Sequence, residues 1–409
     1  MFEVTHWKKL KWCIQVSGSK NAALPIIAAN CILPEKINLR NKPQISDVQV
    51  MERLIDQAEK NNQKDALDLT SKYAQKIRSC ILLIPYGLIK YWKVVFANPG
   101  WCKIWKRSMS TFDDALHQAG IKISQNKYKS YKISGKPAKQ IILKEFSVTA
   151  TESLITYLAF ANNFDYKINI KQIAIEPHVI NLIDFLKNVW AQIQINYDHS
   201  ITIAPSKIKI KQKEFEIIWD YIEAGTFFSI AAATNNSEIT ITNFNTNDLV
   251  AVYSLADSIW INYEIIDQKT LKVNSYNKNN YKPVKLQTWI FPWFPTDLQS
   301  IFGVLLTQIK WISKIHETLF EWRFTYLAEM ENLGAKIEIL NPHQVIIIWK
   351  SILQWGYVNT TDLRGWWAML LAGILAKWKT YITDEDIILR WYEDIEKKLK
   401  SIWVEITRC

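Results

Sequence analysis

The stretch Ala119-Gly120-Ile121-Lys122-Ile123 recurs in outline four more times along the chain, and this recurrence decides the fold. In each copy a helix-like segment runs into an alternating apolar segment through a short junction. The other copies start at Val189, Ile259, Leu333 and Ile402, and the third residues of successive copies are 70, 70, 74 and 69 positions apart. A regular period of this length indicates repeated supersecondary units.

The second position of the junction follows a helix and precedes a strand, where a left-handed residue, usually glycine, ends the helix. Gly120 and Gly334 occupy it in two copies, and Trp190, Trp260 and Trp403 occupy it in three. The chain holds 19 Trp and 11 Gly, which together make about the 7% that glycine alone normally contributes. Tryptophans that stack on bases or sugars would not share one helix-ending position with glycine. We therefore interpret many tryptophans as glycine positions, as would follow if the source organism reads UGA as glycine.

Five junctions over this length predict six units, each with a helix and a strand pair and with a further strand and helix before the next junction. Hairpins are expected where residues 193–195 meet 201–203 and where 337–339 meet 345–348. A sixth junction is missing near residues 55–65, so that unit is expected to be degenerate or shortened. The prediction is an α/β fold with two domains of three units each, 20–219 and 1–19 plus 220–409.

Composition narrows the class of protein. No apolar run reaches the roughly 18 residues of a membrane span, and no signal-peptide stretch is seen. The five cysteines are scattered without CxxC spacing, which indicates reduced thiols in a cytoplasm. The six histidines form no ligand pattern, so neither a metal nor a cofactor is expected. The net charge of +11 suits anionic partners, but no Lys/Arg block is long enough for a nucleic-acid arm.

Two segments combine a small-residue turn or loop with cations. In the segment from Val16 to Pro25, a strand, a turn and a helix start place Lys20 and Asn21 where an anion could bind, although many such turns carry a solvated lysine. In the segment from Pro99 to Arg107, Cys102 lies among three cations. Such surroundings favour a reactive thiol, whereas a lone cysteine is more often inert.

Two further segments leave equal alternatives open. Asp297 follows Pro292 and Pro295 where a helix would begin, so it is either a helix cap or a positioned carboxylate base. Arg364 and Arg390 are either surface ion-pair partners or readers of carboxylate and phosphate, because the guanidinium presents a fork of donors.

Together these segments resemble the family of UDP-N-acetylglucosamine 1-carboxyvinyltransferases, also called UDP-N-acetylglucosamine enolpyruvyl transferases. The resemblance covers essentially the whole chain, and nearly every Trp falls where that family has Gly; Trp367 falls where it more often has Ala. The motifs that carry it are SGSKNAALP (17–25), KIRSCILL (76–83), PGWCKIWKR (99–107), EAGTF (223–227), FPTDLQ (294–299), HETLFEWRF (316–324), TTDLRGWWAMLLAG (360–373) and LRWYEDIEKKL (389–399).

The resemblance implies two inside-out α/β barrel-like domains, each of about three repeated helix and strand units. It implies transfer of the enolpyruvyl group of phosphoenolpyruvate to the 3′-hydroxyl of UDP-N-acetylglucosamine with release of phosphate. That reaction is the first committed step of peptidoglycan synthesis, so a cytoplasmic location and a role in cell wall biogenesis, cell shape and cell division are expected. The expected partners are these two small molecules, without nucleic acid, membrane or cofactor, and the chain is expected to act as a monomer.

The resemblance also implies roles for residues. Cys102 resembles the thiol general acid, and Asp297 resembles the base that removes the proton from the 3′-hydroxyl. The residues expected to bind phosphoenolpyruvate are Lys20, Asn21, Arg107 and Arg390, of which Asn21 also resembles a sugar-nucleotide contact. Those expected to bind UDP-N-acetylglucosamine are Arg78, Arg107, Ser108, Met109, Ser110, Thr111, Glu145, Phe146, Ser147, Val148, Asp297 and the backbone of Leu319. Asp362 and Arg364 are expected to border the site.

The sequence departs from the family in three places. Residues 108–112 replace the family's Pro-x-Asp-Leu-His, Glu145 stands where the family has Lys, with Lys144 adjacent, and the first repeat is shortened. Two alternatives therefore stay open: a non-catalytic homologue that binds sugar nucleotides, and an enzyme like 3-phosphoshikimate 1-carboxyvinyltransferase. The Cys102 loop and the Lys20-Asn21 pair argue against the second.

Overall fold

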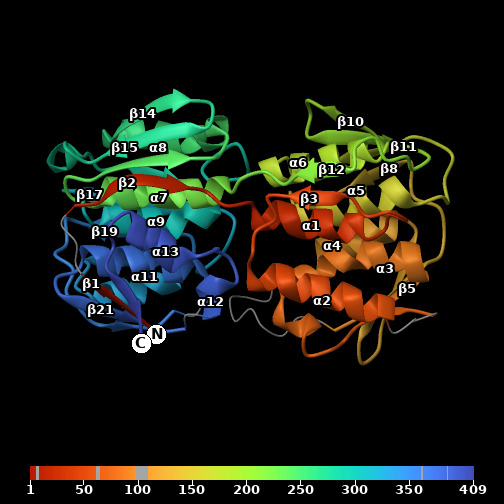
Figure 1. The fold of residues 1–409 in the computed structure, drawn as a ribbon, viewed down its shortest axis with the longest axis horizontal. Helices are drawn as coiled ribbons and strands as arrows, with labels where there is room; N and C mark the ends of the chain where they lie inside the picture. Colours follow the sequence, from red (N-terminus) through yellow and green to blue (C-terminus); the bar gives the residue numbers. More distant parts are fainter. Residues whose placement is uncertain (6–8, 61–64, 98–108, 361–362, 385) are drawn as a thin grey trace. The chain divides into compact units, whose positions relative to one another are not determined.

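The chain divides into two compact units in the computed structural model, which describes residues 1–5, 9–60, 65–97, 109–360, 363–384 and 386–409 (Figure 1). The continuous unit is Gly18–Ile218, and the split unit combines Met1–Ser17 with Trp219–Cys409. These boundaries lie within two residues of the division proposed from the sequence.

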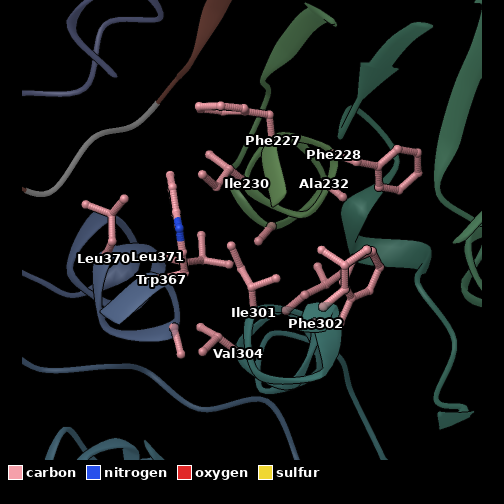
Figure 2. Close-up of a cluster of buried hydrophobic side chains, with 14 of the residues drawn as sticks. Phe227, Phe228, Ile230, Ala232, Ile301, Phe302, Val304, Trp367, Leu370 and Leu371 are labelled. Carbon is pink, nitrogen blue, oxygen red and sulfur yellow. The ribbon is translucent and has the colours of Figure 1, made fainter. Parts of the chain in front are cut away.

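The split unit has three inner helices, α7 (Tyr221–Ala233), α9 (Gln299–Leu306) and α11 (Leu363–Leu375). All residues of α7 and α9 are buried, as expected of helices that are apolar on every face and lie in a core. The three helices pack against one another, with Ile301 and Leu371 among the side chains between them (Figure 2).

Three four-stranded sheets belong to the split unit. Their strand orders are β20 (Tyr357–Val358), β21 (Lys379–Ile382), β1 (Phe2–Thr5), β22 (Ile406–Arg408); β14 (Asn262–Asp267), β15 (Thr270–Asn274), β13 (Glu238–Thr242), β2 (Lys11–Gln15); and β16 (Lys285–Gln287), β17 (Ile312–His316), β19 (Gln344–Ile348), β18 (Ile337–Asn341). The remaining helices of this unit are α8 (Val250–Ile259), α10 (Thr325–Asn332), α12 (Asp386–Leu389) and α13 (Ile395–Ser401), with 3-10 turns η3 (Thr246–Leu249), η4 (Lys278–Asn280) and η5 (Thr296–Leu298).

The continuous unit repeats this plan with one reduced sheet. Its inner helices are α1 (Lys20–Asn30), α3 (Leu83–Tyr91) and α5 (Val148–Phe160), and its other helices are α2 (Ser46–Lys60), α4 (Ser110–Gln118) and α6 (Pro177–Asn188), with 3-10 turns η1 (Ala74–Lys76) and η2 (Arg78–Leu82). Two sheets have four strands, in the orders β4 (Leu67–Leu69), β5 (Lys93–Phe96), β7 (Lys129–Ile133), β6 (Ile121–Gln125) and β10 (Gln192–Asn196), β11 (Ser200–Ala204), β9 (Ile168–Lys171), β8 (Gln140–Ile142). The third is a parallel pair, β3 (Asn38–Arg40) with β12 (Glu214–Glu216).

Buried helices enclosed by sheets confirm the predicted inside-out α/β architecture. The two predicted hairpins are the antiparallel pairs β10–β11 and β18–β19. The two-stranded sheet explains the missing junction: in the described residues of that repeat, the chain leaves α2 without forming the strand hairpin that follows the other junctions.

All five junctions adopt the same left-handed backbone. The φ angles are +82° at Gly120 and +93° at Gly334, and 73°, 72° and 71° at Trp190, Trp260 and Trp403. A left-handed conformation costs a residue with a Cβ about 1–2 kcal/mol, and glycine adopts it without that cost. The tryptophans therefore stand at positions whose backbone favours glycine.

Left-handed tryptophans also occur outside the junctions. Among the described residues, nine tryptophans have positive φ: Trp12, Trp92, Trp190, Trp260, Trp311, Trp322, Trp349, Trp378 and Trp403. Each of these nine side chains is between 41% and 73% exposed. By contrast Trp366 and Trp367 of α11 are buried, with their rings edge to face at 5.9 Å. The interpretation as glycine positions is thus supported at nine places by backbone geometry, whereas Trp366 and Trp367 are accommodated inside α11.

Candidate active site

Asp297 lies in η5, immediately before the inner helix α9 of the split unit. Neither it nor Thr296 caps a helix, since no side-chain capping hydrogen bond is formed at the start of η5 or of α9. The capping alternative for Asp297 therefore does not hold in this structure. Its side chain instead joins two arginines.

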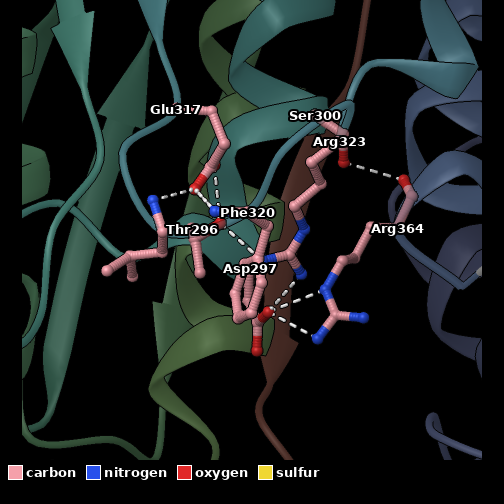
Figure 3. A network of polar contacts seen from close by, with 8 residues as sticks. Thr296, Asp297, Ser300, Glu317, Phe320, Arg323 and Arg364 are labelled. Atoms are coloured by element: carbon pink, nitrogen blue, oxygen red, sulfur yellow. Dashed lines mark hydrogen bonds and ion pairs between the residues drawn. The ribbon is translucent and has the colours of Figure 1, made fainter. Parts of the chain in front are cut away.

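One carboxylate oxygen of Asp297 accepts hydrogen bonds from both guanidinium groups (Figure 3). Oδ1 lies 2.7 Å from Nη2 of Arg323, and 2.7 Å and 2.6 Å from Nε and Nη2 of Arg364. The hydroxyl of Ser300 on α9 donates to the carbonyl oxygen of Arg364 at 2.8 Å, which ties the start of α11 to α9. Arg364 lies on the inner helix α11 and Arg323 in the turn before α10, so the carboxylate and both cations belong to one unit.

A buried carboxylate, Glu317, holds the neighbouring turn. Its Oε1 accepts hydrogen bonds from the amides of Leu319 and Phe320 at 3.0 Å and 3.3 Å. Burial raises the pKa of the Glu317 carboxyl, while the hydrogen bonds from Thr296 and from the amides of Leu319 and Phe320 lower it. Because the amide of Leu319 donates to Glu317, its carbonyl oxygen is the backbone group left for a ligand contact.

Arg323 and Glu317 were missed in the sequence, although both lie in the motif HETLFEWRF. Arg323 is only 9% exposed at its side chain and its guanidinium lies over the ring of Phe320, 4.8 Å from the centroid. The sequence offered no signal that pairs Arg323 with Asp297, because Glu317 and Glu321 of the same motif lie nearer in sequence and could equally supply the anion that a buried guanidinium requires.

In the continuous unit, Lys20 is the first residue of α1 and is paired. Its Nζ lies 2.5 Å from Oδ2 of Asp47 in the first turn of α2, and the two side chains are 8% and 4% exposed. Ser19 caps α1, with its hydroxyl accepting from the amide of Ala22 at 3.4 Å. Asn21 follows, half-buried. A buried cation and a helix start in one place suit an anionic ligand.

Two other helix starts carry the residues predicted to contact uridine and diphosphate. Ser147 caps α5 and Val148 is its first residue, with Glu145 and Phe146 exposed just before it. At α4, Met109 and Ser110 begin the helix and Thr111 is buried in its first turn. Arg78 begins η2 and is half-buried. The N–H groups of a helix start are suited to phosphate oxygens.

Four predicted site residues, Cys102, Arg107, Ser108 and Asp362, lie outside the described residues. Arg390 directly follows α12 and is half-buried. Of the described cysteines, burial raises the pKa of Cys31 to about 11 and that of Cys80 to about 12, which keeps both as thiols. No group of three His, Cys, Asp or Glu side chains within the described ranges could hold a metal ion. Nor is any helix in those ranges long and apolar enough to cross a membrane.

Comparison with known proteins identifies the family. A model of the EPSP synthase (3-phosphoshikimate 1-carboxyvinyltransferase) family matches residues 4–399. The chain is 32% identical over 423 residues to the UDP-N-acetylglucosamine 1-carboxyvinyltransferase of Pelagibacter ubique, covering 99% of both chains. It is 30% identical to the enzyme of the same name from Pseudothermotoga lettingae, covering 96% of both, and 31% identical to that of Wolbachia pipientis, covering 98% of this chain and 97% of the other.

The chain belongs to the UDP-N-acetylglucosamine 1-carboxyvinyltransferase family. Solved structures agree with this family's fold. The enolpyruvyl transferase NikO from Streptomyces tendae superposes with a TM-score of 0.86 at 16% identity, over 99% of this chain and 98% of the other. EPSP synthase from Acinetobacter baumannii gives a TM-score of 0.71 at 12% identity, over 100% and 99%. At these identities the likeness shows the enolpyruvyl transferase fold alone.

Proposed function

We propose that the chain transfers the enolpyruvyl group of phosphoenolpyruvate to the 3′-hydroxyl of UDP-N-acetylglucosamine and releases phosphate. The observation that carries the proposal is the Asp297 carboxylate held between Arg323 and Arg364, in a chain whose full-length relatives bear that enzyme's name. A carboxylate oriented by fixed cations provides a proton acceptor, and nearby cations offset the repulsion between two anionic substrates.

The reaction balances with the residues assigned. The 3′-oxygen loses its proton to Asp297 and attacks C2 of phosphoenolpyruvate, while Cys102 delivers a proton to C3. The tetrahedral intermediate then loses a proton from C3, the bond from C2 to the phosphate oxygen breaks, and the double bond re-forms. Lys20, Asn21, Arg107 and Arg390 are proposed to hold phosphoenolpyruvate.

The sugar nucleotide is proposed to use residues that each unit supplies. Its contacts would come from Arg78, residues 107–111, residues 145–148, Asp297 and Leu319, with Asp362 and Arg364 at the border. This activity would place the chain in the cytoplasm at the first committed step of peptidoglycan synthesis, acting as a monomer, with consequences for cell wall, cell shape and cell division.

The deciding experiment measures phosphate release from phosphoenolpyruvate with and without UDP-N-acetylglucosamine. The protein is made with Gly at the nine left-handed Trp positions, and shikimate 3-phosphate replaces the sugar nucleotide in a parallel reaction. Release that depends on UDP-N-acetylglucosamine supports the proposal, and release that depends on shikimate 3-phosphate supports the alternative enzyme. A folded protein that binds the sugar nucleotide without phosphate release is a non-catalytic homologue.

The loop assignment has its own test. An epoxide phosphonate such as fosfomycin is expected to form a covalent adduct on Cys102, detected by peptide mass spectrometry. Cys102→Ala is expected to abolish both the adduct and the turnover. Turnover that survives Cys102→Ala unchanged contradicts its role as general acid.

A further inference from the structure

Glu317 is an anchored residue with no exposed surface. It directly follows strand β17, and its amide donates to the carbonyl of His343 at 2.8 Å. Nδ1 of His343 lies 2.7 Å from the Glu317 carbonyl oxygen. Main-chain contacts on both sides therefore fix where the side chain of Glu317 starts.

The Glu317 carboxylate serves two directions at once (Figure 3). Oε1 holds the turn at Leu319 and Phe320 through two amides. Oε2 accepts the hydroxyl proton of Thr296 at 2.6 Å. Because the Thr296 hydroxyl donates its proton to Glu317, its oxygen Oγ1 is left to accept a hydrogen bond from another donor.

Arg323 uses that hydroxyl oxygen. Its Nη1 donates to Oγ1 of Thr296, and its Nη2 donates to Oδ1 of Asp297 at 2.7 Å. Two acceptors on one edge of a planar guanidinium fix both its plane and its rotation. The chain of contacts thus runs from Glu317 through Thr296 and Arg323 to the Asp297 carboxylate.

We infer that Glu317 is a positioning residue: by holding Thr296 as an acceptor it orients Arg323 and hence Asp297, and by holding two amides it shapes the turn at Leu319. The inference rests on the proposed function, in which Asp297 is the base and Leu319 contacts the sugar. It adds a separate assignment: the buried carboxylate of Glu317 sets the geometry of both Asp297 and the turn at Leu319. Removing the acceptor at Thr296 should therefore impair the chemical step more than substrate binding, because a misplacement of about 1 Å can cost about 100-fold in rate.

Three variants separate the hydrogen bond of Glu317 with Thr296 from its hydrogen bonds with the amides of Leu319 and Phe320. Thr296→Val removes the hydroxyl at nearly constant size and breaks only the branch to Arg323, whereas Thr296→Ser keeps it. Glu317→Gln can still accept from the turn amides but presents an N–H group to Thr296. All are made in the full-length chain on the glycine-restored background, and thermal unfolding checks that each is folded.

The expected result is a split between kcat and KM. Thr296→Val should lower kcat about 10- to 100-fold with the KM for UDP-N-acetylglucosamine within about threefold, and Thr296→Ser should restore kcat to within about threefold. Glu317→Gln should also lower kcat, and the double variant should lose no more than the worse single variant, because both act through one route. Equal loss in Thr296→Val and Thr296→Ser, or additive losses in the double variant, overturns the inference.

A structural measurement keeps this inference distinguishable from the proposed function. Crystal structures of the parent and the Thr296 variants should show the Arg323–Asp297 contact retained with Ser and lost with Val. If the parent releases no phosphate, the proposed function fails while the position of Arg323 still decides the positioning role. An unchanged Arg323–Asp297 contact in folded Thr296→Val overturns the positioning role of Glu317. If Thr296→Val cannot be produced, an unchanged Arg323–Asp297 contact in Glu317→Gln overturns it instead.

Discussion

The Arg364 guanidinium meets the Asp297 carboxylate through a single oxygen, with Oδ1 2.7 Å from Nε and 2.6 Å from Nη2. Arg323 donates to the same oxygen from another side. Within the described part of the chain, the hydrogen bonds and ion pairs of this carboxylate all use Oδ1. In the proposed reaction, Oδ2 is therefore the oxygen that would accept the proton of the 3′-hydroxyl.

Asp297→Asn should abolish this proton acceptor while keeping an oxygen for the arginines. We expect kcat for phosphate release to fall about 10²- to 10⁴-fold, the usual range for losing a general base. Binding of UDP-N-acetylglucosamine, measured by calorimetry, should change much less. Asp56→Asn, at an exposed position of α2, is the matched control and should leave kcat unchanged. A kcat for Asp297→Asn within threefold of the parent would rule out its role as the base.

Glycine at the left-handed tryptophans should stabilise the chain. Trp92 (φ 63°) ends α3 and Trp378 (φ 72°) follows α11, and their side chains are 68% and 73% exposed. Each change to Gly should raise the free energy of unfolding by about 1 kcal/mol, since relief of the left-handed strain outweighs the extra entropy of glycine. The measurement is the shift of the denaturant midpoint.

Trp92→Ala and Trp378→Ala are the controls for these two positions. Alanine removes the ring but keeps the Cβ that the left-handed backbone disfavours. We therefore expect the alanine variants to remain near the parent. If alanine stabilises as much as glycine, the ring and not the backbone is responsible, and the argument from φ is lost.

The buried pair of Lys20 and Asp47 should matter more to stability than an exposed pair. Asp47→Asn removes the carboxylate 2.5 Å from a lysine that is 8% exposed, and loss of one partner in such a pair typically costs about 3–5 kcal/mol. Glu59→Gln breaks the pair of Lys36 and Glu59, whose side chains are 50% and 41% exposed, and should cost at most about 1 kcal/mol. Comparable losses in the two variants, measured by chemical denaturation, would contradict the assigned burial.

Asp220 should make stability depend on pH. Burial, and then the charge of Glu223, raise the pKa of Asp220 from 3.8 to about 7, against the lowering effect of two amides of α7. Because the folded pKa lies above the unfolded one, its contribution to stability is complete below about pH 4 and is lost as the pH rises through 7. The neighbouring groups are Tyr392, Asp297 and Glu223, of which Glu223 is paired with Lys398.

Asp220→Asn isolates this effect, because asparagine can still cap α7. Between pH 4 and pH 7, the free energy of unfolding of the parent should fall relative to that of Asp220→Asn. The fall should be at most about 1.4 kcal/mol for each unit by which the pKa is raised. Parallel stability curves for the parent and the variant over this range would show that the carboxyl of Asp220 is not protonated in the folded state.

The sequence predicted what depends on local pattern. The junction repeat predicted two domains with a shortened unit, and the helix-end slot predicted the left-handed backbone later seen at Trp190 and Trp260. These features are readable because a helix end and a hairpin are each specified within a few consecutive residues.

Partners brought together by tertiary packing could not be read in the same way. Asp297 was found, but Arg323 is 26 residues away in sequence and was missed. The same holds for Lys20 and Asp47, which lie on different helices, and for the parallel pairing of β3 with β12 across 176 residues. No local periodicity specifies which distant groups will face each other across a core.

The nine solvent-facing tryptophan rings also bear on the history of the gene. A large side chain retained by selection is normally met by a complementary surface, as Trp367 is by Tyr392, with ring centroids 4.5 Å apart. The nine rings are instead 41% to 73% exposed, even where two of them pack edge to face, as Trp311 and Trp349 do at 4.9 Å, and each stands on a left-handed backbone that favours glycine. If the codons of these nine tryptophans are read as glycine in the organism, an intact-mass measurement on protein from its own cells should find a chain lighter than this translation.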